Sequence, residues 1–303
     1  MTFLEIRQRV AEIIGVDHAD TTTDSNATMV NKLKEWVNAR YRALASSRSW
    51  NWTIKDSVIQ TAAEITTGTV TATLASTTIT FSNAPTPSVA GWFIQFSDSN
   101  DWYPITAHTA ATTTATLGFA YLGTTSSTLT FTLRKVYYAL PSDTSKILNL
   151  KQTRSDVSLQ YISARQIDSI IPNKTQVEDP RYYTISGLDS SRQYRTEFYP
   201  VASVAMNINI RYYCVVAELS SDSDVPLIPE GFHDFLVWDT LATYGFMFMD
   251  DTRTSAAKAM ANDIFKQLKD NDVATEDLPV RFASDDVPSH WNDQNRFNRY
   301  PII

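Results

Sequence analysis

The hydrophobic positions of this chain change their period twice, and each change marks a boundary between predicted elements. Residues 3–47 and 229–271 carry apolar side chains at three- and four-residue intervals, which predicts a pair of amphipathic helices in each segment. The residues between them alternate polar and apolar side chains, which predicts short β-strands. Each helix pair has an apolar face that it cannot bury alone. We therefore predict an α+β protein, with a helical bundle from N- and C-terminal helix pairs and an inserted all-β body.

The N-terminal pair is predicted to have its first helix end at Gly15 and its second run to about Ser46. Leu33 and Trp36 lie on the apolar stripe of the second helix, and we expect both in the bundle core. After this helix, residues 50 and 52 are tryptophans at the spacing of an extended strand, so both rings are expected on one side of it.

The third predicted helix starts with Pro229 at or near its first position, where the missing N–H of proline costs nothing. Its apolar residues surround the helix, which indicates the centre of a bundle more than a ligand pocket. A fourth helix follows from Asp250. The core residues expected from the third helix are Phe235, Trp238 and Tyr244.

The alternating segment divides into two predicted regions. Residues 53–136 contain many threonines, and the part from Ser57 to Leu133 holds three acids and no lysine or arginine. Short strands at this spacing predict a sandwich or barrel, and their apolar alternation argues against a low-complexity linker. The predicted domains are 1–52 with 229–271 as a discontinuous helical bundle, 53–136 as the insert, 137–228 as a second β region, and 272–303 as an extended C-terminal arm.

The arm has no sustained period but keeps large apolar side chains, which a purely solvated tail does not need. We expect it to dock on another protein, and a fold-back onto its own domain is the alternative. The expected docking residues are Phe282, Trp291, Phe297, Tyr300, Ile302 and Ile303.

Composition narrows the function classes. The net charge of −7 argues against a protein that grips nucleic acid over its whole surface, but it suits a channel through which DNA slides. Cys214 is the single cysteine, so a disulfide framework is excluded and folding in a reducing cytoplasm is expected. The sequence has no long apolar run and its first helix is amphipathic, so we expect no membrane span and no signal peptide.

The search for catalytic chemistry predicts no catalytic, metal or cofactor residues, and hence no enzyme. The chain has eight glycines and no glycine-rich phosphate loop, and its four histidines are scattered without the spacing of metal ligands. The run Asp222-Ser223-Asp224 resembles part of a calcium loop but lacks the central glycine and the distal glutamate. It fits a polar loop that leads into a helix.

One group in the charge-poor insert is a possible contact surface. Asp98 and Asp101 stand close in sequence to Trp92 and Trp102, and acids beside aromatic rings often line sugar-binding sites. A glycoside hydrolase would need two carboxylates about 5–10 Å apart in a cleft. An exposed turn flanked by core tryptophans is the simpler interpretation. A receptor- or glycan-binding tail protein that uses this β body is the alternative function.

Several strings resemble the head-to-tail adaptor (connector, tail tubular A-like) proteins of short-tailed bacteriophages. The strings are EWVNARYRALASSRSWNW, YYALPSDTSKILNL, DPRYYTISG, YPVASVAMNINIRYY and LSSDSDVPLIPEGFHDFLVWDTLA, in this order. They cover most of the chain outside the threonine-rich insert, which departs from the shortest members of that family.

The resemblance implies a structural virion protein in the neck of a phage particle, assembled in the host cytoplasm. Its partners would be further copies of itself in a ring, commonly of twelve, the portal protein above, and a downstream tail or nozzle protein. Double-stranded DNA would pass through the lumen without specific binding. C-terminal arms of similar adaptors climb onto the portal, which would account for the aromatic residues of the arm.

Overall fold

The computed structural model describes residues 1–16, 24–170, 176–202 and 204–272. Contacts divide this part of the chain into two compact units. The helical unit combines Met1–Thr53 with the chain from Glu218 onward, and the β unit comprises Ile54–Ala217. The helices lie at both ends of the sequence and the strands between them, so the predicted α+β class is confirmed.

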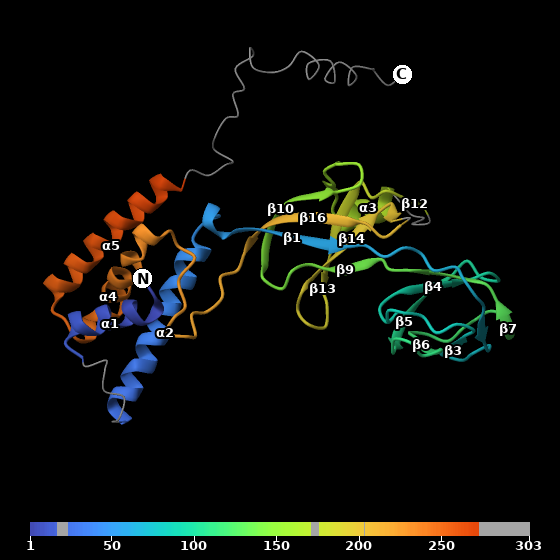
Figure 1. Ribbon diagram of the computed structural model, residues 1–303, viewed down its shortest axis with the longest axis horizontal. Coiled ribbons are helices and arrows are strands. Elements are labelled where there is room, and N and C mark those ends of the chain that lie inside the picture. Colours follow the sequence, from blue (N-terminus) through green and yellow to red (C-terminus); the bar gives the residue numbers. More distant parts are fainter. Residues whose placement is uncertain (17–23, 171–175, 203, 273–303) are drawn as a thin grey trace, which may run out of the picture. The chain divides into compact units, whose positions relative to one another are not determined.

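Four helices build the helical unit (Figure 1), and each has an apolar face at helical spacing. In chain order they are α1 (Phe3–Ile14), α2 (Asp24–Ser46), α4 (Asp234–Tyr244) and α5 (Asp251–Asn271). Helix α4 contacts α1, α2 and α5, and α1 also contacts α2. Buried apolar side chains at these contacts include Phe3, Ile6, Val10, Leu33, Val37, Phe235, Leu236, Leu241 and Leu268.

The ends of α1 follow from local chemistry. Thr2 and Glu5 form a capping box, in which each side chain accepts a hydrogen bond from the other residue's backbone N–H. Gly15 ends the helix as predicted, with a φ of 74° that glycine adopts without steric cost. Asp250 caps α5 by accepting a hydrogen bond from the backbone N–H of Arg253.

The third predicted helix is shorter than its sequence pattern indicates. Pro229 precedes a 3-10 turn, η2 (Glu230–Phe232), and the α-helix begins only at Asp234. It ends at Tyr244, where a second 3-10 turn, η3 (Gly245–Met247), follows. The prediction was wrong here because 3-10 turns continue the apolar spacing of a helix without its hydrogen-bond pattern.

The prediction of a strand at the two tryptophans after α2 was also wrong. Residues Asn51–Thr53 form a 3-10 turn, η1, and the ring centroids of Trp50 and Trp52 lie 5.8 Å apart. Trp50 is fully buried, and its indole N–H donates to the carbonyl of Leu44 at 2.8 Å. The same carbonyl at the end of α2 also accepts from the backbone N–H of Ser47, so the indole adds a further bond to the helix terminus.

A seven-stranded antiparallel sheet curls into a nearly closed barrel in the β unit, as predicted for the threonine-rich insert. The order across the sheet is β7-β2-β3-β6-β5-β4-β8. Only Thr130 separates β7 from β8 in the chain, so the two strands at the ends of the sheet adjoin. The strands are β2 (Val70–Ala72), β3 (Thr78–Phe81), β4 (Phe93–Phe96), β5 (Trp102–His108), β6 (Thr114–Leu117), β7 (Ser126–Leu129) and β8 (Phe131–Arg134).

Alternation along each strand fills the barrel. In β3 the side chains of Ile79 and Phe81 are buried while those of Thr78 and Thr80 are exposed. Every other residue of a strand faces the interior, so threonine supplies the outer face and apolar residues the inner one. The barrel core contains Val70, Ile79, Phe81, Trp92, Ile94, Phe96, Tyr103, Ile105, Leu117, Tyr121, Phe131 and Leu133.

Two further sheets of the β unit share a second core. The first has the order β1-β16-β10 and the second β11-β13-β14-β9, and a buried cluster takes residues from both. Helix α3 (Ala164–Ile170) and a short parallel pair, β12 (Val177–Glu178) with β15 (Val201–Ala202), complete the region. The strands of the two sheets are β1 (Ile54–Gln60), β9 (Tyr137–Ala139), β10 (Thr144–Gln152), β11 (Gln160–Tyr161), β13 (Tyr182–Leu188), β14 (Tyr194–Tyr199) and β16 (Asn207–Cys214).

The predicted insert boundary at residue 53 needs a correction. Strand β1 falls within 53–136 but pairs antiparallel with β16, from Ile54 opposite Tyr213 to Gln60 opposite Asn207. The barrel strands therefore begin only after β1. Alternation in the sequence shows that a strand exists, but the partner of β1 is some 150 residues away and leaves no local signal.

Candidate interaction surfaces

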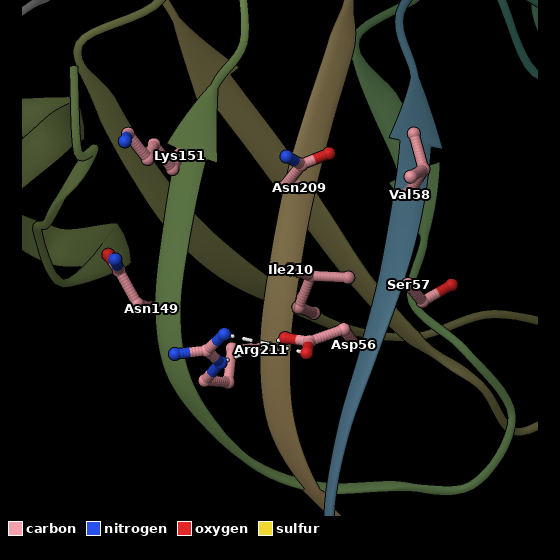
Figure 2. Close-up of a pocket in the computed structure, with 8 residues that line it drawn as sticks. All are labelled: Asp56, Ser57, Val58, Asn149, Lys151, Asn209, Ile210 and Arg211. Atoms are coloured by element: carbon pink, nitrogen blue, oxygen red, sulfur yellow. Dashed lines mark hydrogen bonds and ion pairs between the residues drawn. The ribbon is translucent and has the colours of Figure 1, made fainter. Parts of the chain in front are cut away.

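The outer face of the β1-β16-β10 sheet carries a polar hollow of about 650 Å³ (Figure 2). Its side chains form two rows across the strands because paired residues of neighbouring strands point to the same face. Asp56, Arg211 and Asn149 make one row, and Val58 and Lys151, on either side of Asn209, make the other. Ser57 and Ile210, which lie between these rows along their strands, complete the lining.

The charged side chains of the hollow have partners, Arg211 within it and Lys151 outside it, at Asp156. The Nε of Arg211 donates to Asp56 Oδ1 at 2.8 Å, and this hydrogen bond raises the pKa of Arg211. Both side chains are exposed, so the pair adds little to stability. The lining has no histidine or cysteine, and Asp56 is engaged by Arg211, so the arrangement offers no general base or nucleophile. It can form polar contacts with a partner but has no evident catalytic chemistry.

The predicted contact surface of the barrel separates into different environments. Trp92 is 5% exposed and lies in the barrel core, so it cannot contribute to an outer surface. Trp102 is half-buried, with the guanidinium carbon of Arg134 4.8 Å from its ring centroid. Asp98 is exposed and accepts hydrogen bonds from the Tyr121 hydroxyl and the backbone N–H of Thr124.

Asp98 therefore joins the connection between β4 and β5 to the segment around Thr124, and Asp101 is exposed at the end of the same connection. Burial, followed by the hydrogen bond to Asp98, raises the pKa of the Tyr121 hydroxyl. These contacts fit the simpler interpretation of an exposed turn flanked by packed tryptophans. The described barrel residues do not combine the four side chains into one sugar-binding face.

The five residues expected in the bundle core differ in burial. Leu33 is fully buried and Phe235 is 5% exposed, whereas the other three are half-buried. Trp36 of α2 stacks on Tyr244 of α4, with ring centroids 5.0 Å apart and planes 8° from parallel. Trp238 lines a surface groove. Aromatic side chains on α4 thus serve both packing between helices and the surface of the unit.

The six residues expected in the docking arm, Phe282, Trp291, Phe297, Tyr300, Ile302 and Ile303, lie outside the described residues. The description of the chain ends at Asp272, which is buried. Its Oδ1 accepts a hydrogen bond from the backbone N–H of Asn51 at 2.9 Å. The end of α5 is therefore fixed to the turn that follows α2.

We call the segment from Leu219 to Asp234 the clamp loop. The sequence indicated only that this segment is polar and leads into a helix. Asn38 of α2 holds the backbone of Leu219 with both groups of its amide, each at 2.9 Å. Arg7 of α1 is 1% exposed and forms an ion pair with Asp222. The Tyr41 hydroxyl accepts from the backbone N–H of Leu227 at 3.0 Å. The loop is thus fastened to both N-terminal helices.

The clamp loop also accepts hydrogen bonds from the first backbone N–H groups of α1. The backbone N–H groups of Phe3 and Leu4 donate to the carbonyls of Asp224 and Asp222, at 2.7 and 3.1 Å. These donors have no partner within the helix, so a loop carbonyl takes the place of water. The Asp224 carboxylate accepts from two loop N–H groups, which lowers its pKa. The acidic run therefore fixes a loop, as expected, and does not form a calcium loop.

A second polar cluster joins strands of the β unit. Asp143 accepts hydrogen bonds from Lys55 Nζ and the Tyr212 hydroxyl, both at 2.8 Å. Burial alone would raise the pKa of Asp143, but these hydrogen bonds outweigh it and lower that pKa. The hydrogen bond to Asp143 raises the pKa of Lys55, and burial with the same carboxylate raises the pKa of Tyr212 to about 12.

Two further searches covered the described part of the chain. No three histidine, cysteine or acidic side chains there gather closely enough to hold a metal ion. Among the helices of that part, none combines the length and the apolar character that a membrane crossing requires. Cys214 is buried, and burial raises the pKa of its thiol, which makes it unreactive.

Comparison with known proteins gives one informative match. A search of curated proteins finds no match to this chain. The sequence model of the SU10 adaptor protein family matches residues 106–283. The matched segment spans more than half of the chain and includes Asp143 and Tyr212, the clamp loop and helices α4 and α5. On this match, the chain belongs to the SU10 adaptor proteins, a family of phage head-to-tail adaptors.

Proposed function

We propose that this protein forms an oligomeric ring between the portal and the tail of a phage particle and continues the DNA channel through the neck. The observation that carries the proposal is the family match over residues 106–283. Membership in a structural adaptor family makes the chain a virion protein that contacts other phage structural proteins, and it argues against an enzymatic role.

Charge supports the channel part of the proposal. The net charge of −7 disfavours binding of duplex DNA to the chain as a whole, because such binding relies on lysine and arginine side chains at the phosphates. Three of the basic residues of α2 and its end are engaged in ion pairs within the helical unit, namely Arg40, Arg42 and Arg48. An acidic lumen of twelve copies would let DNA slide without specific binding.

The ring is tested by mixing the purified chain with portal rings. We expect negative-stain images to show an added ring beneath the portal, and mass measurement to give an integral number of copies. A chain that stays monomeric and leaves portal rings unchanged would contradict the proposal. The downstream tail or nozzle protein can then be added to the assembled complex to test the second contact.

We also propose that the arm beyond Asp272 docks on the portal through its aromatic side chains. A chain truncated from Asp285 onward removes most of these residues and leaves the described fold intact. We expect it to melt like the full chain and to lose portal attachment. A truncated chain that unfolds would show that the arm belongs to its own core.

A receptor- or glycan-binding role for the threonine-rich barrel has less support. Trp92 is in the barrel core, and the ring of Trp102 is partly covered by Arg134. Binding of the barrel to a glycan array, abolished by Trp102→Ala, would favour this alternative over the purely structural role. The expected result is no glycan binding by either protein.

A further inference from the structure

The turn between α4 and α5 exposes three consecutive large apolar side chains. Phe246, Met247 and Phe248 are 64%, 50% and 41% exposed. Single exposed apolar residues are normal on soluble proteins, but a contiguous apolar patch is typical of an interaction site. The turn is followed directly by two acidic residues, Asp250 and Asp251.

Hydrogen bonds hold this turn in one conformation. The backbone N–H groups of Phe248 and Met249 both donate to the carbonyl of Gly245, at 2.9 and 2.8 Å. The ring centroid of Phe248 lies 6.3 Å from that of Trp36, which ties the turn to α2. Because the turn is already ordered, a partner that binds it loses little conformational entropy.

The same helical unit has an apolar groove of about 280 Å³ at its surface. A cavity of about 150 Å³ holds a benzene molecule, so this groove has room for a phenyl ring and an aliphatic neighbour. Phe246 of the same chain leaves it unfilled, since that side chain is largely exposed. The groove is lined by Ile13, Trp238, Leu241, Met249, Arg253, Ala256, Ala257 and Met260.

We infer that Phe246 and Met247 of one copy insert into this groove on the next copy. The inference rests on the proposed ring and names a contact that closes it. A projecting patch that fits a pocket elsewhere on the same molecule makes a head-to-tail contact, and such contacts form rings when their rotation closes. A two-fold contact would seat the turn of each copy in the groove of the other and would stop at a dimer.

Charge also fits this partner. Arg253 lines the groove, and it forms no ion pair with any residue that the structure describes. Asp251 stands beside the projecting turn and is exposed. When the turn of one copy enters the groove of the next, an acidic group approaches a basic one, which favours this orientation over others.

The first test is Phe246→Ser in the full chain, with Leu122→Ser as the matched control. Leu122 is 70% exposed and lies in the β unit. We expect Phe246→Ser to raise the concentration needed for self-association about tenfold or more, with an unchanged thermal melt. The control should assemble like the wild type. Wild-type assembly by Phe246→Ser would overturn the inference.

The second test fixes the geometry with cysteines. Single variants Phe246→Cys and Met260→Cys are mixed and oxidised, while the buried Cys214 stays protected. We expect disulfides between the two variants, and none with a Leu122→Cys control. In the double variant Phe246→Cys/Met260→Cys, the head-to-tail contact links copies beyond the dimer. Oxidation of that variant that stops at dimers would indicate a two-fold contact and overturn the head-to-tail contact.

Portal binding separates this inference from the proposed function. If Phe246→Ser keeps its self-association but loses portal attachment, the turn seats the portal and the inference fails. If the wild-type chain attaches to the portal without self-association, the inference also fails while an adaptor role stands.

Discussion

The helical unit and the barrel hold themselves together by different means. Long-range side-chain contacts fasten the helical unit, such as Arg7 with Asp222 and Arg40 with Asp239, whose partners are 215 and 199 residues apart. The barrel relies on its backbone ladder and apolar core, with an ion pair between Arg134 and Glu64. A strand bonds to its neighbours through its backbone, whereas a helix uses its backbone bonds internally and must contact neighbours through side chains.

The strongest test of this difference is Trp50→Ala. Trp50 is fully buried in the helical unit, and its ring lies 6.0 Å from that of Phe265. Removing a buried tryptophan costs about 3–5 kcal/mol, so we expect the helical transition in calorimetry to fall sharply. The barrel transition should stay in place. An equal shift of both transitions would show that the two units unfold as one.

Asn38→Ala tests whether the clamp loop matters to the helical unit. The substitution leaves the buried N–H and carbonyl of Leu219 without their partner, at a cost of about 1–3 kcal/mol each. We expect faster cleavage of the Leu219–Asp234 loop in limited proteolysis and a lower helical melting temperature. Asn149→Ala, on the exposed sheet face, is the control and should behave like the wild type.

Asp222→Asn tests how much the ion pair with Arg7 stabilises the helical unit, compared with an exposed ion pair of the β unit. Arg7 is buried, so losing the carboxylate weakens the solvation of a buried charge and should cost about 1–3 kcal/mol in chemical denaturation. Asp56→Asn breaks the pair with Arg211 on the exposed face of the β unit. Both side chains of that pair are exposed, so its loss should leave the denaturation midpoint essentially unchanged. Equal losses in both variants would remove the distinction between the two pairs.

Tyr212→Phe tests a smaller, pH-dependent contribution in the β unit. The folded pKa of about 12 exceeds the ordinary tyrosine value of about 10. The neutral phenol therefore stabilises the fold fully below pH ~10, and this contribution is lost as the pH rises from 10 to 12. We expect wild-type stability to fall over this range more than that of Tyr212→Phe. Parallel curves for both proteins would contradict this role.

The same phenol donates to Asp143, whose pKa is lowered in the folded state. A lowered carboxyl pKa stabilises the fold above its unfolded value and loses this contribution as the pH falls through the folded value. Acid titration of Asp143→Asn against the wild type should show that loss in the wild type only.

Periodicity in the sequence predicted the elements whose cause is local. The end of α1 at Gly15, the start of α5 at Asp250 and the inward alternation of Ile79 and Phe81 all follow from neighbouring residues. Pairing between distant segments was not predictable from such signals. Strand β1 joins β16, and Asn38 holds Leu219, through contacts that exist only once the chain has folded.

The candidate site shows the same division. The tryptophans near Asp98 were expected to be core residues beside an exposed turn, which Trp92 confirms, but the sequence did not show that Arg134 covers the ring of Trp102. The exposed turn at residues 246–248 was read as part of a helix, because its apolar run continues the helical spacing. The sequence shows whether a side chain is polar or apolar, whereas its exposure depends on which residues pack against it in the fold.

The single residue between β7 and β8 determines how much unpaired strand edge the barrel sheet exposes. Because the first and last strands of the barrel sheet adjoin at Thr130, the sheet presents little free edge to a neighbouring copy. Unpaired strand edges are templates for pairing with other chains and for aggregation. The nearly closed sheet therefore limits edge-to-edge pairing of the threonine-rich barrels of different chains.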